Sequence, residues 1–112
     1  MSTITTHVLD TARGRPAEGL RITLSRRTEG GAFEELASGT TNDDGRIRDL
    51  VPDGVPRGVY QMLFDTGGYF EALGLEGFYP LAAICFEIAA DDEHYHIPLL
   101  LSPYGYSTYR GS

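Results

Sequence analysis

The three histidines of this chain are its first candidates for catalytic or metal-binding residues. His94 and His96 are separated by one residue within an alternating run, and His7 lies near the N-terminus. Because side chains two residues apart in a β-strand point to the same face, His94 and His96 would share one face of a sheet. With His7 they could transfer protons, or supply the three protein ligands of a catalytic zinc site. A third alternative, that His94 and His96 are surface or interface residues without a catalytic role, also stays open.

Two further features could bind a ligand. Arg46 directly follows the turn-forming run Asn-Asp-Asp-Gly at 42–45, and a guanidinium held at a strand start could orient a planar urea-like or carboxylate group. Spacing alone does not separate Arg46 from Arg48. Residues 104–112 are aromatic and rich in hydroxyls, which predicts an ordered end. The alternative is a tyrosine-rich edge strand with a random polar finish.

The composition excludes several classes of partner. The 112 residues carry 9 Lys and Arg against 16 Asp and Glu, and the resulting net charge of -7 argues against a nucleic-acid partner. No window approaches the roughly 18 apolar residues of a membrane-spanning helix, and no basic segment precedes an apolar run at the N-terminus. Cys85 is the only cysteine, so an internal disulfide and a cysteine-based zinc cage are excluded. We expect one domain over 1–112, in the cytoplasm and without a membrane partner.

Short alternating apolar runs, separated by Gly, Pro, Asn and Asp, predict a β-sandwich or barrel. The expected strands are 4–9, 20–25, 33–38, a short one starting at Arg46, 59–65, 81–88, 95–101 and 104–110. The one expected helix covers 69–75 after Gly67-Gly68, with an apolar side formed by Phe70, Leu73 and Leu75.

The expected strand 95–101 is apolar on both faces. One face carries Tyr95, Ile97, Leu99 and Leu101, and the other carries His96, Pro98 and Leu100. One face can cover the core of the sandwich, and a symmetric oligomer is the simplest cover for the other. A histidine in such a partly dry interface could be tuned as a general base.

Four segments resemble the 5-hydroxyisourate hydrolases, a transthyretin-related family. They are Thr-His-Val-Leu-Asp at 6–10, Thr-Asn-Asp-Asp-Gly-Arg at 41–46, the run at 94–107, and Tyr-Arg-Gly-Ser at 109–112. The similarity covers the whole chain, and the last tetrapeptide is highly specific, because transthyretin shares the fold but lacks that ending. Transthyretin also lacks histidines at the positions of His7 and His96, so these two residues separate the enzyme from the hormone carrier.

The resemblance implies an all-β, transthyretin-like sandwich of two four-stranded sheets with one short helix. It also implies a homotetramer, a dimer of dimers, with active sites in a channel where the two dimers meet. The implied reaction is hydrolysis of 5-hydroxyisourate to 2-oxo-4-hydroxy-4-carboxy-5-ureidoimidazoline in urate breakdown, without a metal or another cofactor. A transthyretin-like small-ligand carrier and a histidine-zinc hydrolase on the same scaffold are the alternatives.

By position, the resemblance assigns catalytic roles to four residues, namely His7, Arg46, His96 and Ser112. It implies that three more shape the substrate-binding site, namely Tyr109, Arg110 and Gly111. His94 is left without a catalytic role. Which histidine is the general base and which orients the substrate stays open.

Overall fold

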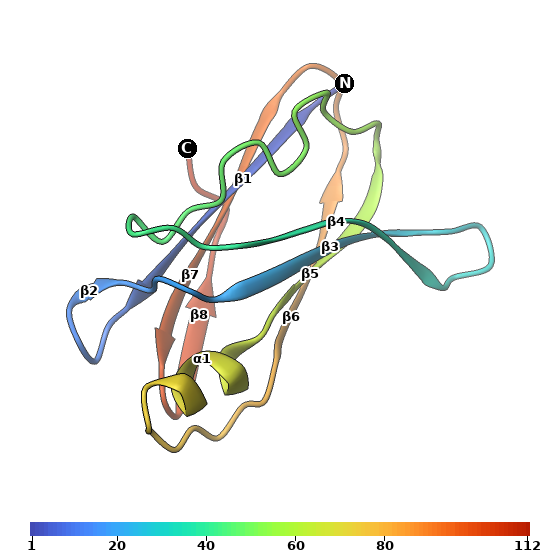
Figure 1. Cartoon of the computed structure of the whole chain (residues 1–112). Helices are drawn as coiled ribbons and strands as arrows, with labels where there is room; N and C mark the ends of the chain where they lie inside the picture. The colour runs from blue at the N-terminus through green and yellow to red at the C-terminus, as the bar shows by residue number, and fades with distance from the viewer.

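Two four-stranded β-sheets face each other, and one short helix lies at an end of the sandwich (Figure 1). The computed structural model describes residues 1–112. The strand orders are β2-β1-β7-β8 and β4-β3-β5-β6. The elements are β1 (Thr3–Asp10), β2 (Arg15–Pro16), β3 (Arg21–Arg27), β4 (Phe33–Thr40), β5 (Gly58–Phe64), α1 (Thr66–Ala72), β6 (Ala82–Ile88), β7 (His94–Ser102) and β8 (Gly105–Thr108). The all-β sandwich with one short helix, expected from the sequence, is confirmed.

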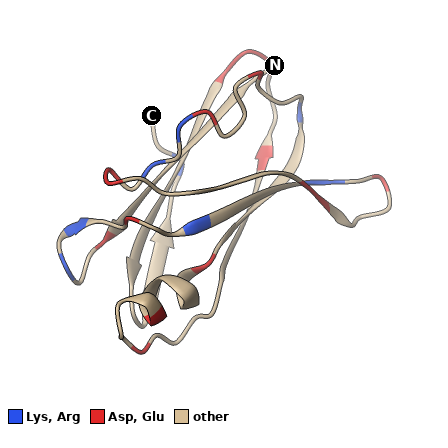
Figure 2. Cartoon of the chain, viewed as in Figure 1, with Lys and Arg blue, Asp and Glu red and all other residues tan.

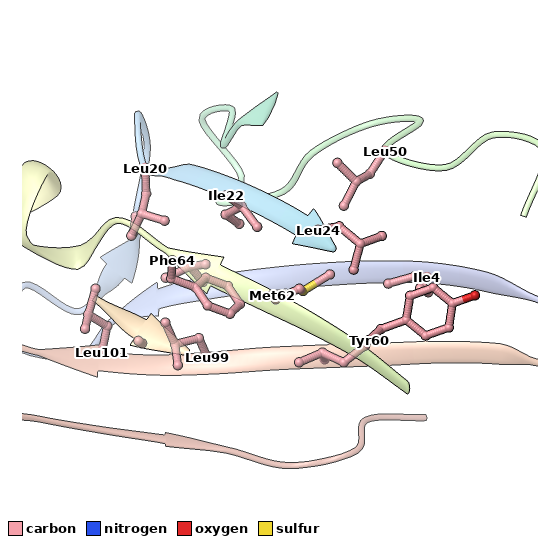
Figure 3. Packing of buried hydrophobic residues seen from close by; sticks show 14 of the residues in the cluster. Ile4, Leu20, Ile22, Leu24, Leu50, Tyr60, Met62, Phe64, Leu99 and Leu101 are labelled. Carbon is pink, nitrogen blue, oxygen red and sulfur yellow. The ribbon is translucent and has the colours of Figure 1, made fainter. Parts of the chain in front are cut away.

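The core lies between the two sheets and is built from alternate residues of facing strands (Figure 3). In β3, Ile22 and Leu24 are fully buried, whereas Arg21 at the start of the strand is exposed. The predicted inner face of β7 is confirmed, because its four residues are all buried, namely Tyr95, Ile97, Leu99 and Leu101. The opposite face of β7 therefore points away from the core.

The strands β1 and β7 lie side by side in the middle of the first sheet and run parallel. Their register sets Thr5 opposite His96 and His7 opposite Pro98. The Thr6 hydroxyl adds a buried hydrogen bond of 2.7 Å to the carbonyl oxygen of Ile97. This register decides which side chains from the two ends of the sequence meet.

The prediction of a strand starting at Arg46 is wrong. Arg46 forms a single antiparallel bridge with His7, and the chain then leaves the sheet through a bend in which Asp49 adopts φ 54. The additional strand of the first sheet is β2, which pairs with the end of β1. Two residues between turns carry no alternating pattern, so the sequence did not reveal β2.

The helix begins earlier than predicted, at Thr66, and ends at Ala72. The cause is Asp65, whose side chain accepts a hydrogen bond of 3.0 Å from the backbone N–H of Gly68 and so caps the N-terminus. Of the three side chains expected on one apolar side, Phe70 is buried but the other two are exposed, namely Leu73 and Leu75. No helix in the protein has the length and apolar character needed to cross a membrane.

Candidate active site

Four of the residues singled out in the sequence lie on one face of the first sheet. His7 of β1 lies opposite Pro98, which shares its face of β7 with His96. Arg46 bridges to His7 from the outer side of β1, and Gly111 bridges to His96 from the β8 side. Directly paired residues project to the same face. Arg46, His7, His96 and Gly111 therefore form a row across the sheet, which we call the site row.

The turn before Arg46 fixes its place in the site row. The Asn42 Oδ1 atom accepts hydrogen bonds from the backbone N–H groups of Asp44 at 2.9 Å and Arg46 at 3.1 Å. The Val8 N–H donates to the Gly45 carbonyl oxygen at 2.9 Å, which holds the turn against β1. Gly45 has φ 73, and a Cβ there would clash with the Val8 carbonyl oxygen. The predicted turn chemistry at 42–45 is confirmed and carries Arg46 to His7.

The imidazole of His96 is half-buried in the site row. Burial lowers its pKa from the usual 6.5, and the positive charges of Arg46, His94 and His7 lower this pKa further. The His96 imidazole is therefore neutral at neutral pH. A neutral imidazole donates a hydrogen bond from one nitrogen and accepts one at the other.

A chain of hydrogen bonds joins His96 to two threonines and to His94. Thr5 Oγ1 lies 2.8 Å from His96 Nδ1 and 2.9 Å from His94 Nε2. Thr3 Oγ1 lies 2.6 Å from His94 Nδ1. The two imidazoles are nearly parallel, with ring centroids 6.5 Å apart and an interplanar angle of 15°. We call this sequence of contacts the Thr3–His94–Thr5–His96 chain.

Sequence reasoning did not single out Thr5. The available signal was alternation, because Thr5 shares the outer face of β1 with His7. That signal says which way Thr5 points but not which residue it meets. The meeting with His94 and His96 depends on the register between β1 and β7.

After β8 the chain leaves the strand and returns to β7 at Gly111. The strand β8 is therefore shorter than the predicted strand 104–110. The Gly111 N–H donates to the His96 carbonyl oxygen at 2.8 Å. A Cβ at Gly111 would lie 2.6 Å from Cδ2 of His96, closer than two such atoms can approach. Glycine therefore lets the backbone pack directly on the imidazole ring.

The Arg110 side chain points away from the site row. Its guanidinium lies 4.3 Å from the ring centroid of Tyr95, which is on the core-facing side of β7, and it forms an ion pair of 3.2 Å with Glu93. These contacts hold the returning chain against β7. The structure does not bring the Arg110 guanidinium together with His7 or Arg46, although the sequence grouped it with the substrate-binding residues.

The other two residues predicted in the C-terminal segment are Tyr109 and Ser112. Tyr109 is 58% exposed, and Ser112 is also exposed. A pocket of about 200 Å³ opens between β6 and the returning chain and includes Tyr109, Arg110 and His96 but neither His7 nor Arg46. The site row itself thus lies on an open sheet face.

Figure 2 marks the positions of Lys and Arg in blue and of Asp and Glu in red along the whole chain. No three His, Cys, Asp or Glu side chains in the chain converge closely enough to form a metal-binding group. The groups that the structure brings together are two imidazoles, one guanidinium and a glycine backbone. Such groups can transfer a proton and stabilise negative charge on a bound oxygen.

This fold and site row define a transthyretin-like sandwich with ionisable groups concentrated on the outer face of one sheet. The family model described as HIUase/Transthyretin family matches residues 4–111, and the chain belongs to this family.

The similar proteins include some named 5-hydroxyisourate hydrolase and some named transthyretin. A protein of Rhizobium meliloti named 5-hydroxyisourate hydrolase 2 is 50% identical, over 97% of this chain and 95% of that protein. The solved 5-hydroxyisourate hydrolase of Klebsiella pneumoniae is 44% identical with a TM-score of 0.88, covering 100% of this chain and 94% of that one. Sea bream transthyretin in complex with thyroxine is 32% identical with a TM-score of 0.92, covering 96% and 93%. The fold is shared by both groups, and the identity is higher to the hydrolases.

Proposed function

We propose that this protein hydrolyses 5-hydroxyisourate to 2-oxo-4-hydroxy-4-carboxy-5-ureidoimidazoline in urate breakdown. The observation that carries the proposal is the site row, in which His7, His96 and Arg46 lie on one face. The named hydrolases at 44% and 50% identity support the same reaction. The substrate is an oxidised purine with several carbonyl groups, which suits a guanidinium and imidazole donors.

The hydrolysis needs a base that takes a proton from water and hydrogen-bond donors that stabilise the developing oxyanion. In our proposal His7 accepts a proton from water as the water oxygen attacks a ring carbonyl carbon. His96 and Arg46 donate hydrogen bonds to the carbonyl oxygen as it becomes negative. The ring C–N bond then breaks, the leaving nitrogen takes up the proton held by His7, and the carbonyl carbon becomes a carboxylic acid. Ser112 and the backbone at Gly111 close one end of the site.

A transthyretin-like carrier is the second candidate, because sea bream transthyretin matches the fold with a TM-score of 0.92. Ultraviolet absorbance of freshly generated 5-hydroxyisourate separates the candidates. We expect faster decay with the protein than without it, and the same rate after treatment with a chelator. Unchanged decay would favour the carrier, and a rate abolished by chelation would favour the histidine-zinc hydrolase.

The planar fork of Arg46 provides the first test of the site row. Arg46→Lys keeps the positive charge but loses the paired donors, so we expect kcat/KM to fall by about tenfold or more. Arg48→Lys is the matched control, because Arg48 is exposed and lies outside the site row. Steady-state kinetics of both variants check this. A larger loss in Arg48→Lys would show that the assignment of the site to Arg46 is wrong.

We further propose that the chain assembles as a homotetramer, a dimer of dimers, which encloses the site row in a channel. The outer face of β7 supports this, because Pro98 and Leu100 make it apolar beside His96. The strands β6 and β8 are edges of their sheets, and edge strands offer unpaired backbone groups to another copy. A second dimer over the open face would exclude water and strengthen the electrostatic interactions there.

Leu100 tests the location of the channel. A carboxylate in a closed apolar interface is costly by several kcal/mol, so we expect Leu100→Glu to lose the tetramer and the activity together. Leu36→Glu is the matched control, since Leu36 is 47% exposed on β4 of the other sheet. Light scattering and turnover are measured on the same samples. An active monomer, or an intact tetramer in Leu100→Glu, would refute a site at this interface.

We propose the cytoplasm as the location of the protein. Support comes from the single cysteine, Cys85, which is unpaired and exposed and so gains nothing from an oxidising compartment.

A further inference from the structure

The hydroxyl group of Thr5 is shared by two imidazoles, and this sharing restricts where their protons sit. A threonine hydroxyl carries one hydrogen, so it can donate to only one of its two imidazole neighbours. Its distances to His94 Nε2 and His96 Nδ1 are 2.9 and 2.8 Å, both within hydrogen-bond range. Satisfying both contacts requires Thr5 to donate to one ring and accept from the other.

Two arrangements satisfy every contact of the Thr3–His94–Thr5–His96 chain while both rings are neutral. In the first, His94 Nε2–H donates to Thr5, Thr5 donates to His96 Nδ1, and the proton of His96 is on Nε2. In the second, every bond is reversed, and His96 carries its proton on Nδ1. The tautomers of the two histidines are therefore coupled through Thr5.

The intrinsic stability of the tautomers favours the first arrangement. It places the proton of both neutral rings on Nε2, and the Nε2–H form is the more stable tautomer of an isolated neutral histidine side chain. Thr5 must then donate to His96 Nδ1. This leaves the Nε2–H of His96 available as a donor on the outer face of the sheet.

We propose that Thr5 is a positioning residue, which holds His96 as the Nε2–H tautomer so that this N–H is directed at the reacting carbonyl oxygen. The role of the N–H rests on the proposed hydrolase function, whereas the tautomer itself does not. The hydrogen bonds of His94 reach His96 only through Thr5. Thr3 fixes the orientation of His94 by its contact of 2.6 Å with Nδ1.

Nitrogen NMR of the wild-type protein tests the tautomer directly, because the chain has only three histidines to assign. Protonated and unprotonated ring nitrogens have well-separated ¹⁵N shifts. We expect a proton on Nε2 and a hydrogen-bonded acceptor at Nδ1 of His96 at neutral pH. A proton on Nδ1 would overturn the proposal, whether or not the protein hydrolyses 5-hydroxyisourate.

Thr5→Val tests the consequence, because valine keeps the shape and strand preference of threonine but removes the hydroxyl. We expect kcat to fall roughly tenfold with little change in KM, and the His96 spectrum to become a mixture of tautomers. Thr5→Ser should restore both, since serine returns the hydroxyl. Thr23→Val, at a half-buried position of β3 in the other sheet, is the matched control and should match wild type.

These readouts separate the possible failures. Wild-type kcat in Thr5→Val, with an unchanged His96 tautomer, would contradict a positioning role. Failure of Thr5→Ser to restore either quantity would contradict it as well. If the wild-type protein does not turn over 5-hydroxyisourate, the proposed function fails, while the ¹⁵N spectra of wild type and Thr5→Val still decide whether Thr5 sets the tautomer.

Discussion

Turnover of 5-hydroxyisourate is expected to fall by about 10² or more when either His7 or His96 is replaced with alanine. His7→Ala removes the group that accepts the proton of water, and His96→Ala removes a donor to the oxyanion. The sheet should remain intact, because both side chains lie on the outer face and are only partly buried. Initial rates from ultraviolet absorbance, together with circular dichroism of each variant, measure the effect.

His94→Ala is the control for these two variants, since it removes an imidazole on the same face of the sheet. We expect a much smaller loss, because His94 reaches the reaction only through Thr5 and His96. Equal losses in all three variants would indicate three imidazoles acting as one set, as the histidine-zinc alternative requires. Wild-type rates in His7→Ala would remove the general base from our mechanism.

The sequence predicted features that depend on neighbouring residues. Alternation separated His96 from the inner residues of β7, because a strand has a side-chain period of two. The run at 42–45 predicted a turn, because its side-chain amide and its glycine suit a tight reversal. Both features are local, and both are confirmed.

The partners of each strand were not predictable from such patterns. Thr5 and His96 are 91 positions apart in the chain, and no periodicity within either strand states that they are adjacent. The same limit concealed the strand β2, whose pairing with the end of β1 is all that defines it. Grouping His7, His96 and Arg46 before the structure therefore required the family resemblance.

One local prediction, the start of the helix, failed because a side-chain contact outweighed the pattern. The helix starts early because Asp65 caps it, so Gly67 and Gly68, which were expected to precede the helix, lie in its first turn. Arg110 was grouped with the substrate-binding residues by the family resemblance; its guanidinium packs on Tyr95 and pairs with Glu93, and its part in substrate binding stays a prediction. Its position in a shared motif did not indicate which residues its side chain contacts.

Arg110 and Gly111 therefore have different roles in the C-terminal segment. Arg110 secures the returning chain to the start of β7, and this contact presents Gly111 to the His96 ring. Removing the segment exposes the His96 ring and frees its carbonyl group, so His96 loses the surface that fixes its orientation. A misoriented donor is a poor stabiliser of an oxyanion, because stabilisation depends on donors already in place.

We therefore expect deletion of residues 109–112 to remove most activity, with turnover reduced by about 10² or more.

Gly111→Ala is the more specific variant, because its Cβ would lie 2.6 Å from His96 Cδ2 and the ring must move. We expect Gly111→Ala to lose about tenfold or more in kcat, as small displacements of catalytic groups do. Gly30→Ala is the matched control, since the nearest atom to its Cβ is 3.9 Å away. Turnover and light scattering are measured together, and a tetrameric, fully active Gly111→Ala variant would show that the contact between Gly111 and His96 does not shape the active site.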